Sequence, residues 1–240
     1  MCNNDVFKFA NEGHAMQSGI TRFKDIVGSE RGKNFLIICP GKSVLKYWNN
    51  IKKFIAEKKP IVLGINNITE LYHPDIHLWT NNERLKQFGE CILKKSKVFI
   101  GCHIQTENLE RHKITNYTLI DYTDRDKSEK PFYDSRNGII KGYYRTSGCL
   151  AIMICHLLGS KNIYIAGLDG FSYDMKKCGE IHWYPSIDDK NRFTNIEWYF
   201  RYDLPMQNVM NCMMENGINF KIITPTLFEN HYARSILLSK

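Results

Sequence analysis

The sequence of 240 residues contains no apolar run of the about 18 to 20 residues that a membrane-spanning helix needs. Its polar start, residues 1–12, lacks the apolar segment of a secretory signal peptide. The eight cysteines include no Cys-x-x-Cys pair, and several of them lie within apolar runs, which indicates reduced and buried thiols. We therefore expect a cytoplasmic protein, in solution or at the inner face of the membrane.

Glycine (16 residues) and proline (7 residues) are too few for a fibrous repeat, and the apolar share of 43% is too high for a disordered chain. Lys and Arg number 33 against 25 Asp and Glu, which gives a formal net charge of +8. This excess suits phosphorylated substrates or anionic membrane surfaces, but no long Lys/Arg block indicates a specific nucleic-acid partner. The length fits one domain that carries a lid segment.

Two nucleotide-binding motifs are also absent. The sequence has neither Gly-x-x-x-x-Gly-Lys-Ser/Thr nor Gly-x-Gly-x-x-Gly, so ATP hydrolysis and hydride transfer lose support.

The closest pair of histidines along the chain, His73 and His77, is separated by Pro74, which breaks the helix that would place both rings on one face. We therefore expect no metal site.

Short apolar runs alternate with amphipathic segments along most of the chain. Strands are expected at 35–39, 61–65, 76–79, 98–100, 118–120, 163–166 and 220–223, and helices at 44–57, 83–93, 147–158, 196–215 and 233–238, with an interruption at Pro205. Ser43 is the predicted N-cap of the first helix. Strands that alternate with helices predict an α/β fold with a Rossmann-like, mostly parallel sheet and helices on both faces.

The domain organisation follows from the same patterning. Residues 1–33 have only short apolar patterns and are expected to form a peripheral leader, whereas residues 34–240 form the α/β domain. Between about 170 and 195 the alternation stops. A loop longer than about 12 to 15 residues in a compact domain is usually functional or disordered, and the aromatic residues and His182 in this segment favour a lid.

Small and amide side chains follow the predicted strands. In an open parallel sheet, ligands bind beyond the carboxyl ends of the strands. The residues at this edge are 40–43, 66–67, 80–82, 145–148 and 167–170. Small residues let the backbone approach a phosphate, helix N-termini at Ser43 and Ser147 offer N–H groups, and asparagines both donate and accept hydrogen bonds. These five loops predict a nucleotide cleft.

One segment resembles a known family. It runs from Arg145-Thr146-Ser147-Gly148 through an apolar helix to a strand ending in Gly167-Leu168-Asp169. The bacterial sialyltransferases of glycosyltransferase family 42 carry Arg-Ile-Thr-Ser-Gly and Gly-Ile-Asp at nearly the same separation. Gly64-Ile65-Asn66 and Trp79-Thr80-Asn81 resemble the two Asn-bearing loops of that family, and the resemblance covers about residues 34 to 228 in order. The block from 145 to 169 is its specific part.

The resemblance implies an enzyme of bacterial polysaccharide biosynthesis. It would transfer a sialic-acid-like (nonulosonic or related keto-) sugar from a CMP-activated donor to a glycan hydroxyl, with no metal or other cofactor. His182 would be the general base, a task that suits an imidazole, and Tyr173 and Tyr184 would face the phosphate of CMP. The residues expected at the donor nucleotide are Gly41, Lys42, Ser43, Asn66, Asn81, Arg145, Thr146, Ser147, Gly148, Gly167 and Asp169. Asp169 is further expected to orient its loop by accepting hydrogen bonds from backbone N–H groups.

Two other functions stay open at this point. One is a Mg²⁺-dependent pyrophosphokinase-like enzyme on a related fold, which would need carboxylates to hold the metal. The other is a nucleotide- or nucleic-acid-binding module without catalysis, which the net charge of +8 and the aromatic residues suggest. Partners beyond the nucleotide sugar and the glycan acceptor include a membrane surface and a second copy of the chain.

Overall fold

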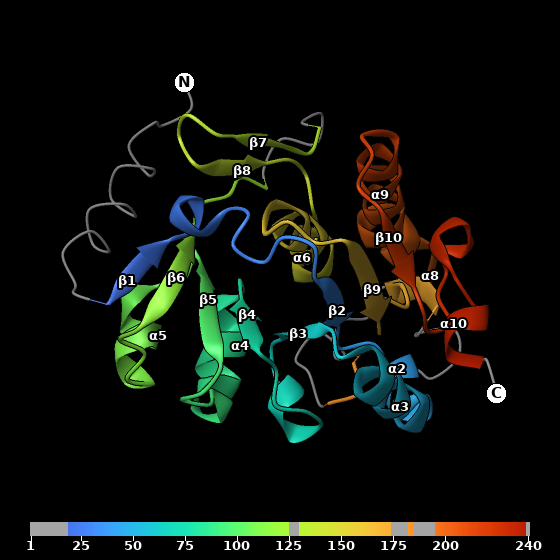
Figure 1. The fold of residues 1–240 in the computed structure, drawn as a ribbon, viewed down its shortest axis with the longest axis horizontal. Helices are drawn as coiled ribbons and strands as arrows, with labels where there is room; N and C mark the ends of the chain where they lie inside the picture. The colour runs from blue at the N-terminus through green and yellow to red at the C-terminus, as the bar shows by residue number, and fades with distance from the viewer. Residues whose placement is uncertain (1–18, 125–129, 174–181, 185–194, 239–240) are drawn as a thin grey trace.

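The computed structural model describes residues 19–124, 130–173, 182–184 and 195–238 (Figure 1). Its main sheet has eight strands in the order β1-β6-β5-β4-β3-β2-β9-β10, and every pairing is parallel. The strands are β1 (Ile20–Arg22), β2 (Asn34–Ile38), β3 (Ile61–Ile65), β4 (Ile76–Trp79), β5 (Lys97–Gly101), β6 (Tyr117–Ile120), β9 (Asn162–Ala166) and β10 (Phe220–Ile222). The predicted Rossmann-like α/β fold is confirmed.

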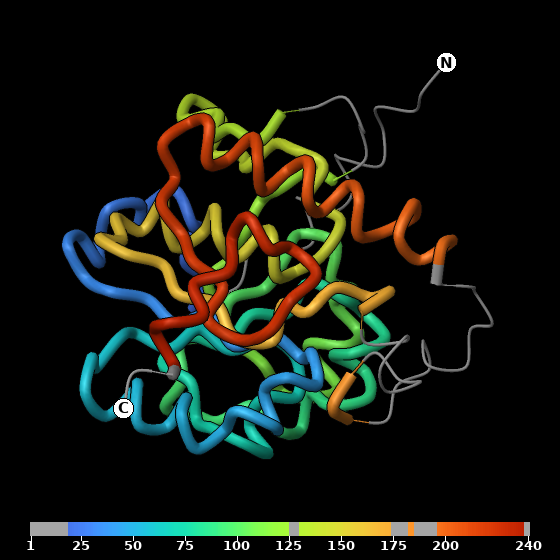
Figure 2. The backbone as a smooth tube through the Cα atoms, turned by 90° about the vertical axis from the view of Figure 1, so that its right-hand side faces the viewer, coloured from blue at the N-terminus to red at the C-terminus, as the bar shows by residue number. Residues whose placement is uncertain are grey.

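Helices cover both faces of this sheet (Figures 1 and 2). One face carries α2 (Ser43–Lys46), α3 (Trp48–Lys58), α4 (Asn82–Phe88) and α5 (Thr106–Arg111), and the other carries α6 (Ser147–Leu157) and α9 (Leu204–Glu215). Right-handed crossovers explain the division. The chain moves outward from β2 to β6, and then returns past β2 to β9 and β10, so its later helices lie on the opposite face.

The centre of the core is β2 together with α6. Phe35, Leu36, Ile37 and Ile38 are all fully buried, as the continuous apolar run predicts for a strand covered on both faces. Helix α6 is apolar around its whole circumference and is buried over most of its length, because β2, β3, β4, β9 and α9 surround it. The six cysteines within the described residues are free, which agrees with the prediction of reduced thiols.

The predicted leader is only partly peripheral. Residues 1–18 lie outside the described residues, but β1 forms the edge of the main sheet beside β6. Phe23, in the 3-10 turn η1 (Phe23–Ile26), is 1% exposed and packs edge-on against Phe99. The boundary predicted between residues 33 and 34 therefore does not separate the leader from the domain. Three residues of strand are too few to show an alternating pattern in the sequence.

Two helix predictions need correction in detail, and three short elements were not predicted. The helix expected at 44–57 is two helices, α2 and α3, that meet at Tyr47. The helix expected at 83–93 is α4 followed by the 3-10 turn η3 (Gly89–Cys91). The sequence analysis missed α5 and the antiparallel hairpin β7 (Phe132–Asp134) and β8 (Ile139–Lys141). All of these elements are shorter than the window over which an apolar period can be recognised.

The helix expected at 196–215 is interrupted, as predicted, close to Pro205. It consists of α8 (Asn195–Trp198), a π-helical turn η5 (Tyr199–Asp203) and α9, with Pro205 in the first turn of α9. A short last helix, α10 (Ser235–Leu238), packs on α3, where Asn50 donates a hydrogen bond to the carbonyl of Leu237. No helix in the described part of the chain has the length and apolarity needed to span a bilayer.

Candidate functional site

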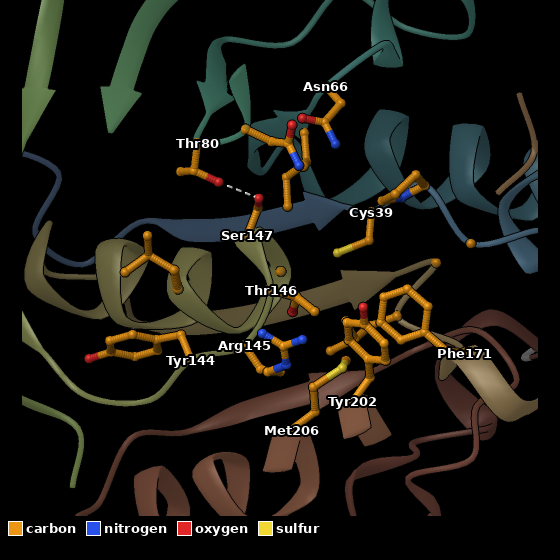
Figure 3. Close-up of a pocket in the computed structure, with 18 of the residues that line it drawn as sticks. Cys39, Asn66, Thr80, Tyr144, Arg145, Thr146, Ser147, Phe171, Tyr202 and Met206 are labelled. Atoms are coloured by element: carbon orange, nitrogen blue, oxygen red, sulfur yellow. Dashed lines mark hydrogen bonds between the residues drawn. The ribbon is translucent and has the colours of Figure 1, made fainter. Parts of the chain in front are cut away.

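A cavity of about 370 Å³ lies at the carboxyl ends of the central strands (Figure 3). The chain leaves β2 toward one face of the sheet and leaves β9 toward the other, so the loops after these neighbouring strands diverge. Crevices of this kind are the usual ligand sites of open parallel sheets. The predicted site residues that line the cavity are Gly41, Asn66, Asn81, Arg145, Thr146, Ser147, Gly148, Gly167, Asp169 and His182.

Four predicted site residues, Lys42, Ser43, Tyr173 and Tyr184, are not among the lining residues. Ser43 is not the N-cap of α2, because its hydroxyl donates to Asp169 Oδ1 at 2.5 Å and its backbone N–H donates to Asp169 Oδ2 at 2.7 Å. The anion site expected at the start of α2 is therefore occupied by a carboxylate of the protein itself. Asp169 accepts from a backbone N–H, as predicted, but this N–H belongs to Ser43, so the carboxylate ties its own loop to the loop after β2.

Close backbone packing joins the loops after β2 and β9. The N–H of Gly41 donates to the carbonyl of Gly167 at 3.0 Å. A Cβ atom on Gly41 would lie 2.4 Å from that carbonyl oxygen and 2.8 Å from Asp169 Oδ2. Gly167 has φ of +77° and would place a Cβ 2.4 Å from the carbonyl oxygen of Cys39. Both positions require glycine, because no larger residue allows the two backbones to meet this closely.

The N-termini of α4 and α6 form the polar edge of the cavity. Thr146 is the N-cap of α6, and its side chain accepts from Cys149 N at 3.3 Å. Ser147 and Thr80 share a hydrogen bond between their hydroxyls (Figure 3). Asn81 is the N-cap of α4, so its Oδ1 is taken by the N–H of Arg84 at 3.1 Å and only its Nδ2 is left for a ligand.

Arg145 is held at the cavity by three contacts. It adopts φ of +67°, and its N–H donates to Asp124 Oδ1 at 3.0 Å. Its Nε donates to the carbonyl of Arg201 at 3.1 Å, and its guanidinium carbon lies 4.4 Å from the ring centroid of Tyr202 (Figure 3). Arg201 belongs to the π-helical turn η5, and Pro205, four residues later, has no N–H that could donate to this oxygen. No backbone donor at residue 205 therefore competes with Arg145 for it.

Asp124 is a cavity residue that the sequence analysis missed. Burial raises the pKa of its carboxyl group, while the backbone and charge of Arg145 oppose the rise. Asp124 comes four residues after the end of β6, at the same edge of the sheet as the predicted loops. Its place after a strand is the signal that could have found it, because the other candidates were selected by that rule.

An aromatic wall, consisting of Phe171, Trp198 and Tyr202, closes the other side of the cavity. The rings of Phe171 and Trp198 are stacked, with centroids 5.3 Å apart and an angle of 6° between planes, and Tyr202 lies 4.8 Å from Phe171. Asp203 fixes this loop by accepting from the N–H of Phe171 at 2.7 Å. The sequence analysis missed the wall because it treated Trp198 and Tyr202 as ordinary residues of a helix.

Residues 182–184 of the predicted lid lie against the loop after β2. Trp183 N donates to the carbonyl of Pro40 at 3.0 Å. His182 lines the cavity and stacks on Tyr184, with centroids 5.3 Å apart and planes at 18°. Tyr184 is buried, and its hydroxyl lies 3.5 Å from Asn66 Nδ2. The remaining lid residues, 174–181 and 185–194, lie outside the described residues.

Asn66 has an unusual conformation and a buried histidine behind it. It lines the cavity with φ of +54° and 7% exposure, and its Oδ1 has no hydrogen-bond partner among the described residues. His77, on β4, is fully buried and its Nε2 lies 2.5 Å from the carbonyl oxygen of Asn66. Burial lowers the pKa of His77 to about 4, and the hydrogen bond with Asn66 opposes this only partly.

The low pKa of His77 predicts a loss of stability in acid. Between about pH 6.5 and 4 the unfolded chain binds a proton at this histidine and the folded chain does not, so the free energy of unfolding falls as pH falls through this window. The expected contribution is about 3 kcal/mol. Urea unfolding of the wild type and of His77→Gln at pH 7 and pH 4.5 checks it. Equal pH dependence in the two proteins would contradict the prediction.

No family model matches the chain, and no curated protein sequence matches it either. Among the residues that the structure describes, no three His, Cys, Asp or Glu side chains are grouped so that they could hold a metal ion.

Proposed function

We propose that the protein is a glycosyltransferase that moves a nonulosonic or related keto-sugar from a CMP-activated donor to a glycan hydroxyl. The observation that carries the proposal is the single cavity into which the loops after β2, β3, β4 and β9 and the N-terminus of α6 all converge. The segment from Arg145 to Asp169 resembles family-42 sialyltransferases, and this resemblance is the reason for proposing a CMP-sugar as the donor and a glycan hydroxyl as the acceptor.

The polar edge of the cavity suits a cytidine nucleotide. The unpartnered Oδ1 of Asn66 needs a donor, and the amino group of cytosine is such a donor. Asn81 offers its Nδ2 to a carbonyl or hydroxyl oxygen. Helix α6 is eleven residues long. Its first turn directs backbone N–H groups and the positive end of the helix dipole toward the cavity at Ser147 and Gly148. A phosphate fits there.

The charges of the cavity suit an anionic sugar nucleotide. Arg145 and Arg84 line it, while both lining carboxylates accept hydrogen bonds from the protein, Asp169 from Ser43 and Asp124 from the N–H of Arg145. A donor of this class carries a phosphate and a sugar carboxylate, and either one would pair with the fixed guanidinium of Arg145. The aromatic wall on the opposite side offers ring faces against which the apolar face of a sugar can pack.

His182 is the proposed general base. As the acceptor oxygen forms its bond to the anomeric carbon of the donor sugar, the bond from that carbon to the phosphate oxygen of CMP breaks, and CMP leaves with the electron pair. The hydroxyl proton passes to His182, which lines the cavity and is oriented by its stacking on Tyr184. Donors near the phosphate, among them Arg145, stabilise the charge of the departing CMP.

A thermal-shift panel tests the donor nucleotide. CMP and CMP-sialic acid, each at 100 times its Kd, should stabilise the fold by about 2.7 kcal/mol, whereas UDP, GDP and ATP at the same concentrations should not. Arg145→Gln should weaken the shift by CMP. Lys42→Ala is the matched control, because it also removes one positive charge but Lys42 does not line the cavity.

The same panel separates the other functions. Stabilisation by ATP only in the presence of Mg²⁺ would favour a pyrophosphokinase-like enzyme. Salt-sensitive binding of single-stranded RNA, with no effect of any mononucleotide, would favour a nucleic-acid-binding module. An absence of any shift with cytidine nucleotides would contradict the proposal.

A further inference from the structure

His77 lies behind the cavity rather than in it, and its side chain forms a hydrogen bond with Asn66. It belongs to β4 between β3 and β5, with its side chain fully buried. Its ring lies 4.8 Å from that of Trp79, and its Nε2 lies 2.5 Å from the carbonyl oxygen of Asn66. Burial lowers the pKa of His77 to about 4, so the ring is neutral near pH 7. A carbonyl oxygen can only accept, so Nε2 carries the proton in the hydrogen bond with Asn66.

The hydrogen bond from His77 stabilises an unfavourable backbone conformation at Asn66. A residue other than glycine in the left-handed region costs energy, and Asn is among the few that adopt it readily. Its carbonyl also accepts from Ile68 N at 2.9 Å, so two donors hold the same oxygen. The carbonyl is thus fixed from behind, and the side chain extends toward the cavity and Tyr184.

We infer that His77 is a positioning residue, which holds the turn at Asn66 so that the amide side chain meets the ligand in one orientation. Asn66 Oδ1 is then an acceptor fixed in space, and it favours a ligand ring that carries an amino group over one that carries a carbonyl at the same place. His77 thereby sets the selectivity of the cavity for cytosine over uracil without touching either. The inference rests on the proposed function for its choice of CMP as the probe.

A buried histidine can also serve stability alone, and the variants must separate the two roles. His77→Gln keeps an N–H donor near the position of Nε2, whereas His77→Leu removes the donor and keeps much of the volume. If His77→Leu does not fold, His77→Asn is a second variant without this hydrogen bond, because the shorter Asn side chain does not reach the carbonyl of Asn66.

Calorimetric titration with CMP and UMP gives the first measurement. His77→Leu should weaken the binding of CMP about tenfold and leave UMP nearly unchanged, so that the preference for CMP falls toward one. His77→Gln should keep the wild-type preference. In an Asn66→Gly background, which retains the left-handed turn but has no amide, the substitution His77→Leu should no longer change the affinity for CMP.

The second measurement needs no ligand. The NMR signal of the Asn66 side-chain amide, assigned from its loss in Asn66→Gly, should shift in His77→Leu and keep its position in His77→Gln. The inference would be overturned if His77→Leu left the Asn66 amide signal unchanged. It would also be overturned if His77→Leu weakened CMP and UMP binding equally in the wild-type and Asn66→Gly backgrounds. If the wild type binds no CMP, the proposed function fails, and the amide signal alone then decides whether His77 positions Asn66.

Discussion

Asp169→Ala is expected to lower the free energy of unfolding by about 3 kcal/mol, because it removes two hydrogen bonds that a buried carboxylate accepts. The backbone N–H and the hydroxyl of Ser43, which is itself buried, would both be left without this partner. The loops after β2 and β9 meet at this carboxylate, so CMP affinity should fall with stability. Urea unfolding followed by circular dichroism measures the first effect.

Two matched variants locate the cause. Ser43→Ala removes only the hydroxyl and should cost about 1 kcal/mol. Asp169→Asn keeps one acceptor oxygen and turns its amide N–H₂ toward a second donor, so its cost should lie between those of Ser43→Ala and Asp169→Ala. A loss below about 0.5 kcal/mol for Asp169→Ala would show that Asp169 does not hold the two loops together.

His182→Ala should lower the turnover of CMP-sugar transfer by about 10² to 10⁴-fold, because proton removal from the acceptor hydroxyl would lose its base. The affinity for CMP should change much less, since the polar edge of the cavity is retained. Initial rates with a saturating glycan acceptor, together with the Kd for CMP, separate the two effects.

His156→Ala is the control for this experiment. His156 lies in the last turn of α6, at the end of the helix away from the cavity, so its replacement should leave turnover within about twofold of the wild type. If His182→Ala keeps most of its turnover, the base is another group. Asp124 would then be the next side chain to replace, because it lines the cavity and burial raises its pKa.

The sequence predicted those features that depend on local chemistry. The run from Phe35 to Cys39 is apolar at every position, which is typical of a strand covered on both faces. The loops after the strands were selected because parallel strands end at a common edge, and most of their residues do line one cavity. Asp169 was expected to accept hydrogen bonds from backbone N–H groups, and it accepts one from the N–H of Ser43.

What the sequence did not predict depends on partners far along the chain. Ser43 looks like an N-cap, but a carboxylate 126 residues later in the sequence takes its hydroxyl. Tyr202 looks like a surface residue of a helix until Phe171 and Arg145 are placed against it. Strand β1 is too short to be recognised except through β6, the strand with which it pairs. In each case tertiary contacts overrule the local pattern.

Pro205 helps to fix the guanidinium of Arg145 at the site, because it has no backbone N–H. A residue with an N–H at this position would compete with Arg145 for the carbonyl oxygen of Arg201. Replacing this proline with alanine to improve the helix would therefore weaken the hydrogen bond between Arg145 Nε and the carbonyl of Arg201. The gain in helix propensity and the loss of a preorganised cation would come from the same substitution, at a residue that does not line the cavity.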